Sequence, residues 1–159
     1  ERTVTVNGFS KCYAMTGWRL GYLAGPQEIM KWVNRILSHS VSHATTFVQW
    51  AGIEALKGPQ DSIKAMVAEF RERRDLLVSG LAEIGIDCPL PGGAFYVFPD
   101  VSDFGGGDGF AERMLSEAMV AATPGSAFGP GGVGNVRISY AASKERLQEA
   151  LGRIAKMLE

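Results

Sequence analysis

Hydrophobic residues alternate with polar ones near the start of the chain and then recur at helical spacing. The alternation predicts strands over residues 2–6 and 17–24. Apolar positions three or four residues apart then predict one helix over residues 27–38 and a second from residue 45 or 46 to residue 56. A glycine and a proline directly after residue 57 end the second helix.

A longer helical pattern runs from about Gln60 to Ile84. Its apolar stripe consists of Ile63, Met66, Val67, Phe70, Leu77 and Leu81. The charged run at residues 71–75 is interpreted as a solvated helix face with local ion pairs. At about 1.5 Å per residue, this helix is long enough to join two domains.

The remaining residues predict a small α+β domain in the order β-β-α-β-β-α. Strands are expected at residues 88–90, 94–98, 120–123 and 135–140, and helices at residues 110–119 and after a cap at Ser143. Residues 104–109, which are rich in glycine, are interpreted as a flexible loop.

The chain starts without a methionine, inside a segment whose pattern predicts a strand. A strand needs neighbours to pair with, and none precedes this one. We therefore expect the sequence to be the C-terminal part of a longer protein.

Composition places the chain among ordinary globular proteins, with 46% hydrophobic and 21% charged residues. Its 159 residues correspond to one domain of common size or to a piece of a larger protein. A formal net charge of −1 gives no support for binding nucleic acid or an anionic membrane. There is no apolar run of the roughly 18–20 residues that span a bilayer, and the first 15 residues do not resemble a signal peptide.

The two cysteines, Cys12 and Cys88, fit neither a metal-binding spacing nor a disulfide framework. This usage favours a reduced intracellular compartment, and we expect a cytoplasmic protein.

Candidate chemistry concentrates in residues 9–22, a stretch of mostly small, aromatic or aliphatic residues. Within it lie Lys11, Ser10 beside it, and Arg19 eight positions later. Apolar surroundings disfavour the charged form of a lysine, so we expect Lys11 to offer a neutral amine for Schiff-base formation or proton transfer. Arginine stays charged, so Arg19 needs an anionic partner. Together the two residues suggest a ligand that carries a carbonyl at one end and a phosphate or carboxylate at the other.

Two other motifs carry little functional weight. Residues 129–134 match G-x-G-x-x-G, but they lead into a strand, whereas a dinucleotide fingerprint opens a helix. His39 and His43 are four residues apart, yet no third ligand of suitable type is near, so they are interpreted as ordinary surface histidines. We therefore expect no metal site.

Arg137 lies in the predicted strand 135–140, on the face opposite Val136 and Ile138. A solvated strand arginine is as good a reading as a functional one when this residue is considered alone. Its planar fork is suited to a carboxylate, and that role gains support if this face meets the Lys11 site.

The order Ser-Lys-x₄-Thr-Gly-Trp-Arg-x-Gly resembles the lysine signature of class I/II aminotransferases of the aspartate/aromatic type. These enzymes are α/β proteins of fold type I that depend on pyridoxal 5′-phosphate (PLP). The resemblance covers the whole chain. Residues 91–96 look like the family's small-domain strand, residues 123–129 like its active-site turn, and residues 135–139 like the strand that carries its substrate arginine.

The resemblance implies a role for each candidate residue. Lys11 would form the internal aldimine, a Schiff base with PLP, and would then move a proton between the substrate Cα and the cofactor. Ser10 and Arg19 would hold the PLP phosphate, and Arg137 would bind the α-carboxylate of the substrate. Tyr13 and Phe128 are expected to line the substrate site.

The resemblance also implies the domain organisation. Residues 1–58 would be the end of the large cofactor-binding domain, residues 59–84 the connecting helix and residues 85–159 the small C-terminal α+β domain. Family members are more than twice as long, and the residues that contact the pyridine nitrogen and the phenolic oxygen of PLP lie upstream of the signature lysine. The connector at residues 42–45 departs from the commoner Asn-Pro version, so no contact with a partner's phosphate is carried over. We expect the chain alone to be inactive and the full-length protein to be a homodimer.

Three functions remain open at this point. The first is transamination between an L-amino acid and a 2-oxo acid through PLP. The second is another PLP reaction on the same scaffold, such as a β-lyase. The third is a PLP-binding module of a transcriptional regulator, for which near-neutral charge offers no support.

Overall fold

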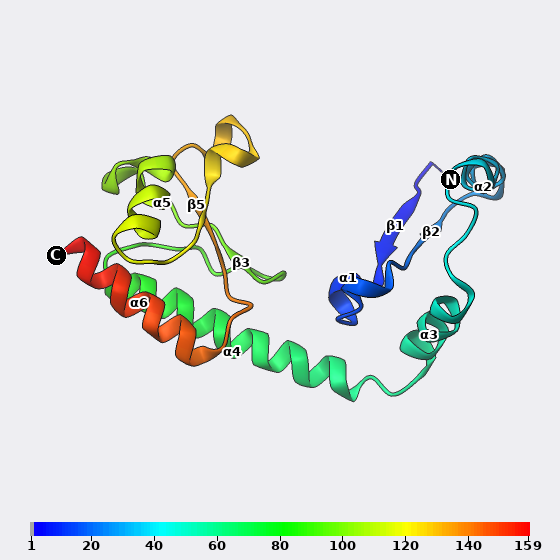
Figure 1. The fold of residues 1–159 in the computed structure, drawn as a ribbon, viewed down its shortest axis with the longest axis horizontal. Coiled ribbons are helices and arrows are strands. Elements are labelled where there is room, and N and C mark those ends of the chain that lie inside the picture. Colours follow the sequence, from blue (N-terminus) through cyan, green and yellow to red (C-terminus); the bar gives the residue numbers. More distant parts are fainter. Residues whose placement is uncertain (1) are drawn as a thin grey trace. The chain divides into compact units, whose positions relative to one another are not determined.

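The computed structural model describes residues 2–159 and divides the chain into two compact units, Glu1–Ala65 and Met66–Glu159 (Figure 1). Each unit has its own sheet: the first contains two strands and the second contains three. Among the described residues, no helix is both long and apolar enough to cross a membrane.

The first unit is built on an antiparallel hairpin of β1 (Thr5–Gly8) and β2 (Gly21–Ala24). Two short helical segments, α1 (Phe9–Cys12) and η1 (Thr16–Trp18), lie between these strands in the sequence. Two longer helices follow, α2 (Gln27–Ser40) and α3 (Thr46–Lys57), close to their expected bounds.

The strand expected over residues 17–24 is wrong in its first half. Residues 16–18 form a 3₁₀ turn instead, and Arg19 ends that turn in the left-handed region at φ 54° and ψ 47°. An extended strand cannot pass through a left-handed residue, so β2 begins only at Gly21. The strand expected over residues 2–6 likewise begins later, at Thr5.

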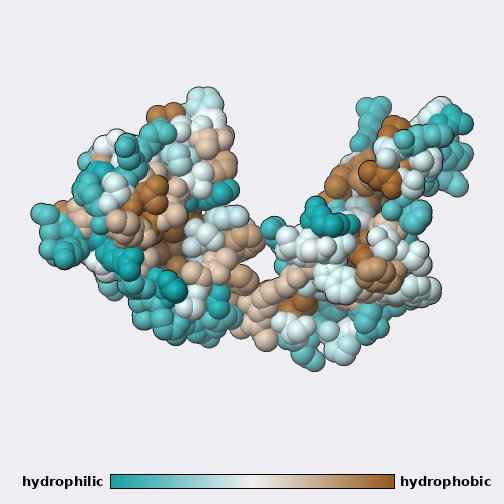
Figure 2. All heavy atoms as spheres, viewed as in Figure 1, coloured by the Kyte–Doolittle hydropathy of each residue, from teal (hydrophilic) through white to brown (hydrophobic). Residues whose placement is uncertain are grey.

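The first unit buries few of its large apolar side chains. Phe9, Met15 and Val48 are buried, and Gly52 of α3 lies so close to Leu20 and Phe9 that a Cβ there would collide with the Leu20 side chain. Other large hydrophobics of this unit are exposed: Val6, Trp18, Tyr22, Leu23, Ile29, Trp32, Ile36, Leu37, Val41, Phe47, Trp50, Ile53 and Leu56. Hydrophobic residues accordingly reach the surface in this unit (Figure 2). The hairpin and α3 thus form a small contact rather than an extensive core.

The second unit has a well-developed core between helices and a three-stranded antiparallel sheet of order β3-β5-β4. The strands are β3 (Tyr96–Val97), β4 (Thr123–Pro124) and β5 (Val136–Ser139). The helices are α4 (Asp61–Glu83), which begins in the first unit, α5 (Gly106–Ser116) and α6 (Lys144–Leu158). Fully buried side chains from all of these helices meet those of the sheet: Leu77, Leu81, Phe110, Met114, Ile154, Val97 and Val136.

The predicted helices of this unit are confirmed in type. The long helix over residues 60–84 matches α4, and the Ser143 cap of α6 accepts a hydrogen bond from the Arg146 backbone N–H at 3.4 Å. The α4 and α6 helices pack closely, because a Cβ on Gly80 would collide with Leu151 (Figure 1).

Three predictions for this unit are wrong. The strand expected over residues 120–123 forms only at its last residue, since β4 spans Thr123–Pro124. Residues 88–90 form no strand, and Pro89 and Pro91 explain this because proline cannot donate to a sheet ladder. Residues 104–109 are not a loop: η2 (Ser102–Phe104) ends there and α5 starts at Gly106. A Cβ on Gly107 would collide with the backbone oxygen of Asn135, so glycine serves close packing rather than flexibility at this point.

Lys144 links the start of α6 to α4 through two carboxylates. Its Nζ lies 3.2 Å from Glu69 Oε2 and also contacts Glu72. Arg73 Nε donates to Glu69 Oε1 at 2.8 Å. Hydrogen bonds from Arg73 and then from Lys144 lower the pKa of Glu69 below its ordinary value.

We expect this cluster to add stability at neutral pH that acid removes. Because the folded-state pKa of Glu69 is lowered, its contribution is fully present above the ordinary value of 4.5 and is lost as the pH falls through the lower folded value. Urea unfolding of the full-length protein between pH 7 and pH 3 should therefore show a shallower loss of stability for Glu69→Gln than for the wild type. The control is Glu112→Gln, since the Glu112 carboxylate has no ion pair with a described residue. An equal pH slope in wild type and Glu69→Gln would contradict this expectation.

Candidate active site

Lys11 lies on the one-turn helix α1 between β1 and η1. The Phe9 side chain anchors this helix, since it is 4% exposed, and its backbone N–H donates to the Leu20 oxygen at 3.1 Å. Two positions after this anchor, Lys11 is exposed, as is its neighbour Cys12. The fold therefore fixes the backbone at Lys11 while its side chain remains accessible.

The apolar enclosure expected around Lys11 is not supplied by the described residues. A helix of four residues can turn only part of its surface inward, and here that part is Phe9. The aromatic residue Tyr13 is half-buried, with its ring centroid 5.4 Å from that of Phe9, and so belongs to this anchor as well.

Thr16 connects Ser10 with Arg19, the two residues expected to hold a phosphate. Its Oγ1 donates to the Ser10 backbone oxygen at 3.1 Å, and its own backbone oxygen accepts from Arg19 Nη1 at 2.8 Å. The left-handed backbone of Arg19 lets its side chain fold back onto this turn. Thr16 belongs to the Ser-Lys-x₄-Thr-Gly-Trp-Arg-x-Gly pattern, but the pattern predicts no role for it, because its two contacts depend on how the turn folds.

An open groove of about 620 Å³ lies beside Arg19. Its lining includes Thr16, Trp18, Arg19, His43, Thr45 and Phe47. Among the described residues, Lys11 does not line this groove. The groove lies instead between Arg19 and the connector at residues 43–45.

Arg137 and Phe128 belong to the second unit. The expected alternation of β5 is confirmed, because Val136 and Ile138 are buried in the core and Arg137 is half-buried on the opposite face. Thr123 on β4 pairs with Arg137, and its Oγ1 accepts from Arg137 Nη2 at 3.3 Å. The guanidinium carbon lies over the rings of Phe128 and Tyr96. Tyr96 and Thr123 were missed as site residues, although their predicted strands could have suggested them.

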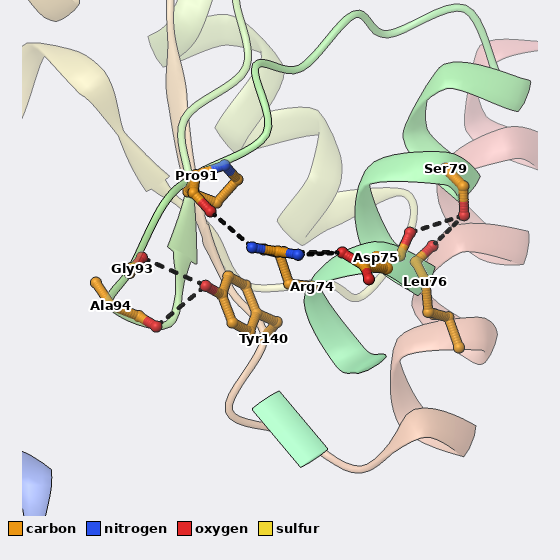
Figure 3. Close-up of polar contacts among 8 residues, drawn as sticks. All are labelled: Arg74, Asp75, Leu76, Ser79, Pro91, Gly93, Ala94 and Tyr140. Carbon is orange, nitrogen blue, oxygen red and sulfur yellow. Dashed lines mark hydrogen bonds and ion pairs between the residues drawn. The ribbon is translucent and has the colours of Figure 1, made fainter. Parts of the chain in front are cut away.

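A polar network fixes the loop that leads into Tyr96 (Figure 3). The Tyr140 hydroxyl donates to the Ala94 oxygen at 3.1 Å, and Arg74 Nη1 donates to the Pro91 oxygen at 3.1 Å. Ala94 has a positive φ of 62°, a conformation that costs a non-glycine residue energy and that these contacts hold in place. Burial raises the pKa of the Tyr140 phenol, so it stays a hydrogen-bond donor at neutral pH.

The two weaker motifs have structural explanations. The glycines of residues 129–134 form a 3₁₀ turn, η4 (Pro130–Gly132), and lead into β5, so they do not open a helix. His39 lies in α2 and His43 beyond its end, and both are exposed. Within residues 2–159 there is no group of three or more histidine, cysteine or acidic residues arranged to hold a metal ion.

Residues 1–154 match the model of the family "Aminotransferase class I and II". The chain belongs to this family, and the predicted resemblance is confirmed. The solved structure of an aromatic aminotransferase from Pyrococcus horikoshii OT3 superposes with a TM-score of 0.96 at 45% identity, over 99% of this chain and 43% of the other. The predicted fold class, a fragment of the α/β aminotransferase fold, is therefore confirmed as well.

Relatives of the chain among curated proteins are also named as aminotransferases. The chain is 45% identical to a putative aminotransferase, YugH, from Bacillus subtilis, over 99% of this chain and 41% of that protein. It is 49% identical to a probable aspartate/prephenate aminotransferase from Aquifex aeolicus, over 99% of this chain and 41% of that protein. The chain thus spans about two-fifths of the length of these relatives.

Proposed function

We propose that the full-length protein is a PLP-dependent aminotransferase that moves an amino group between an L-amino acid and a 2-oxo acid. The observation that carries this proposal is the arrangement of Ser10, Lys11 and Arg19 around α1 and η1, in a chain that belongs to the aminotransferase family. A β-lyase reaction and a regulatory PLP module are the alternatives that the experiments below separate from it.

The residues present fit a ligand such as PLP by the chemistry of their donors. PLP carries an aldehyde and a phosphate. Lys11 offers a primary amine for the aldehyde, and Ser10 offers a hydroxyl for the phosphate beside the permanently charged guanidinium of Arg19. Thr16 keeps Ser10 and Arg19 on one turn, which suits two groups that grip the same anion.

In the proposed reaction each residue of the chain has one task. PLP, when bound, supplies an electron sink for negative charge that develops at the substrate Cα. Lys11 Nζ would hold the cofactor, and as a neutral amine it would take the proton from the substrate Cα. Arg137 binds the substrate α-carboxylate through the N–H groups of its fork. Tyr13 and Phe128 line the substrate site in this proposal.

The reaction type is tested by product analysis with the full-length protein. We expect aspartate or an aromatic amino acid, mixed with 2-oxoglutarate, to yield the matching 2-oxo acid and glutamate in equal amounts. Ammonia released without an amino acceptor would indicate a lyase instead. Absence of turnover together with specific DNA binding would indicate a regulator. The two amino donors follow the names of the relatives, which include aspartate and aromatic-amino-acid aminotransferases, and 2-oxoglutarate serves as a test 2-oxo acid.

Replacing Arg137 with alanine is expected to raise KM for the amino acid by at least about 30-fold, since removing one partner of a desolvated ion pair costs about 2–5 kcal/mol. The measurement is steady-state kinetics of the full-length protein. The matched control is Arg71→Ala, which removes an exposed arginine of α4 and should leave KM unchanged. Equal KM values for Arg137→Ala and the wild type would remove Arg137 from the substrate site.

The same proposal includes the assembly and the domain roles. Residues 1–58 would belong to the cofactor domain, residues 59–84 to the connecting helix and residues 85–159 to the small domain. We infer a homodimer for the full-length protein and no transamination by the 159-residue chain alone, because that chain spans only about two-fifths of its relatives.

A further inference from the structure

The outer face of the three-stranded sheet gathers several side chains around Arg137. The register pairs Tyr96 with Ser139 and Thr123 with Arg137. Side chains alternate across a strand, so Arg137 and Ser139 share one face while the buried Ile138 occupies the other. Tyr96, Thr123 and Arg137 therefore come from three different strands and meet on the face that points away from the core.

Two aromatic rings cover the guanidinium. The Arg137 Cζ lies 4.4 Å from the ring centroid of Tyr96 and 4.6 Å from that of Phe128. Phe128 in turn lies edge-on to Phe98, with centroids 6.0 Å apart and an interplanar angle of 84°. The ring of Phe128 thus has a support of its own, and it belongs to η3 (Gly125–Phe128), a turn outside the sheet.

The electrostatics of Arg137 point to an external anion. Among residues 2–159, no carboxylate forms an ion pair with it, and its hydrogen bond to Thr123 is long, at 3.3 Å. The faces of the aromatic rings attract the guanidinium, but they carry no net negative charge to neutralise it. They also leave N–H groups of Arg137 available for a hydrogen-bond acceptor. A half-buried arginine in this setting has a fixed position and an unmatched charge.

We propose that Tyr96 and Phe128 are positioning residues that hold the Arg137 guanidinium for the carboxylate of the substrate. For Phe128 this adds a positioning role to the lining role proposed above, and for Tyr96 it assigns a role that the sequence did not suggest. The proposal rests on the proposed function, in which Arg137 binds that carboxylate. Each ring restricts the rotamers of the long Arg137 side chain. Less conformational entropy is therefore lost when the substrate carboxylate binds.

The test uses four variants of the full-length protein: Tyr96→Leu, Tyr96→Phe, Phe128→Leu and Arg137→Ala. The first readout is the dissociation constant of propionate, which carries a carboxylate and no amino group, measured by calorimetry. The second readout is KM and kcat for the amino acid. Tyr96→Leu and Phe128→Leu should weaken propionate binding and raise KM by about 3- to 30-fold, the range that corresponds to the loss of one cation–π contact. The kcat values should stay within about threefold of the wild type, and Tyr96→Phe, which keeps the ring, should behave as the wild type.

A double-mutant cycle separates positioning from a merely structural role. If Tyr96 acts through Arg137, Tyr96→Leu should add no further loss of propionate binding once Arg137 is alanine. An equal loss in both backgrounds, or no loss in either, would overturn the inference. Should Arg137→Ala itself leave propionate binding unchanged, the carboxylate role of Arg137 fails instead. Urea unfolding of each variant confirms that it is folded before binding is measured.

Discussion

Replacing Lys11 with alanine in the full-length protein is expected to lower kcat for transamination by more than about 10³-fold, because the proposed function gives this one residue both the covalent anchoring and the proton transfer. The structure supports this dual use, since α1 fixes the backbone through Phe9 while the Lys11 side chain is exposed. The measurement is the rate of 2-oxo acid formation at saturating amino acid and saturating PLP. Saturating PLP prevents weak cofactor binding from being mistaken for a catalytic defect.

The matched control is Lys57→Ala, which removes an exposed lysine at the end of α3 and should retain the wild-type rate. A Lys11→Ala protein that keeps more than a tenth of the wild-type kcat would exclude Lys11 as the proton carrier. An equal loss of activity in Lys11→Ala and Lys57→Ala would indicate that both variants are misfolded.

Replacing Gly125 with alanine is expected to destabilise the protein by about 3 kcal/mol, the upper end of the usual overpacking range, because two backbone segments would have to move apart. A Cβ on Gly125 would collide with the backbone oxygen of Gly132 and lie 2.6 Å from that of Asn135. A Cβ on Gly132 would in turn collide with the backbone oxygen of Gly125. The turn that carries Phe128 is thus packed against the segment before β5, backbone to backbone.

The measurement is urea unfolding of the full-length protein, with soluble yield as a first indication. The control is Gly152→Ala in α6, where a Cβ would meet no neighbour within 4 Å. That variant should gain up to about 1 kcal/mol, since alanine has the higher helix propensity. Unfolding of Gly125→Ala within 1 kcal/mol of the wild type would contradict the close backbone contact.

Helical periodicity predicted the long helices, and strand alternation predicted which side chains of β5 face the core. Leu77 and Leu81 of the α4 stripe and the inward side chains of β5 are buried as the pattern predicts, because burial of one face is what creates such a pattern. Val67 of the same stripe is exposed. The bounds of α2 and α3 also follow from helical periodicity, although the apolar face of α2 is exposed in this structure.

Backbone conformation and close packing could not be read from the pattern. Arg19 adopts a left-handed conformation, which an arginine in the sequence does not predict. For this reason the strand expected over residues 17–24 does not form in its first half. Glycines at 105–107 suggested flexibility, yet Gly107 lies against the backbone of Asn135. Composition alone cannot distinguish these two uses of glycine, since both require the absence of a side chain.

The candidate site was predicted in its residue types and only in part in its surroundings. Lys11, Ser10 and Arg19 were singled out by their spacing, whereas the link through Thr16 depends on how the turn folds. Likewise, Arg137 was singled out on its strand, but its contact with Tyr96 requires the register between β3 and β5.

The most direct measurement of the central claim is chemical mapping of the cofactor. The full-length protein is incubated with PLP, treated with sodium borohydride and digested, and its peptides are sequenced by mass spectrometry. We expect a phosphopyridoxyl group on Lys11 and on no other lysine, with no label when PLP is omitted. A label on a different lysine, or no label on Lys11, would contradict the assignment of this residue as the site of PLP attachment.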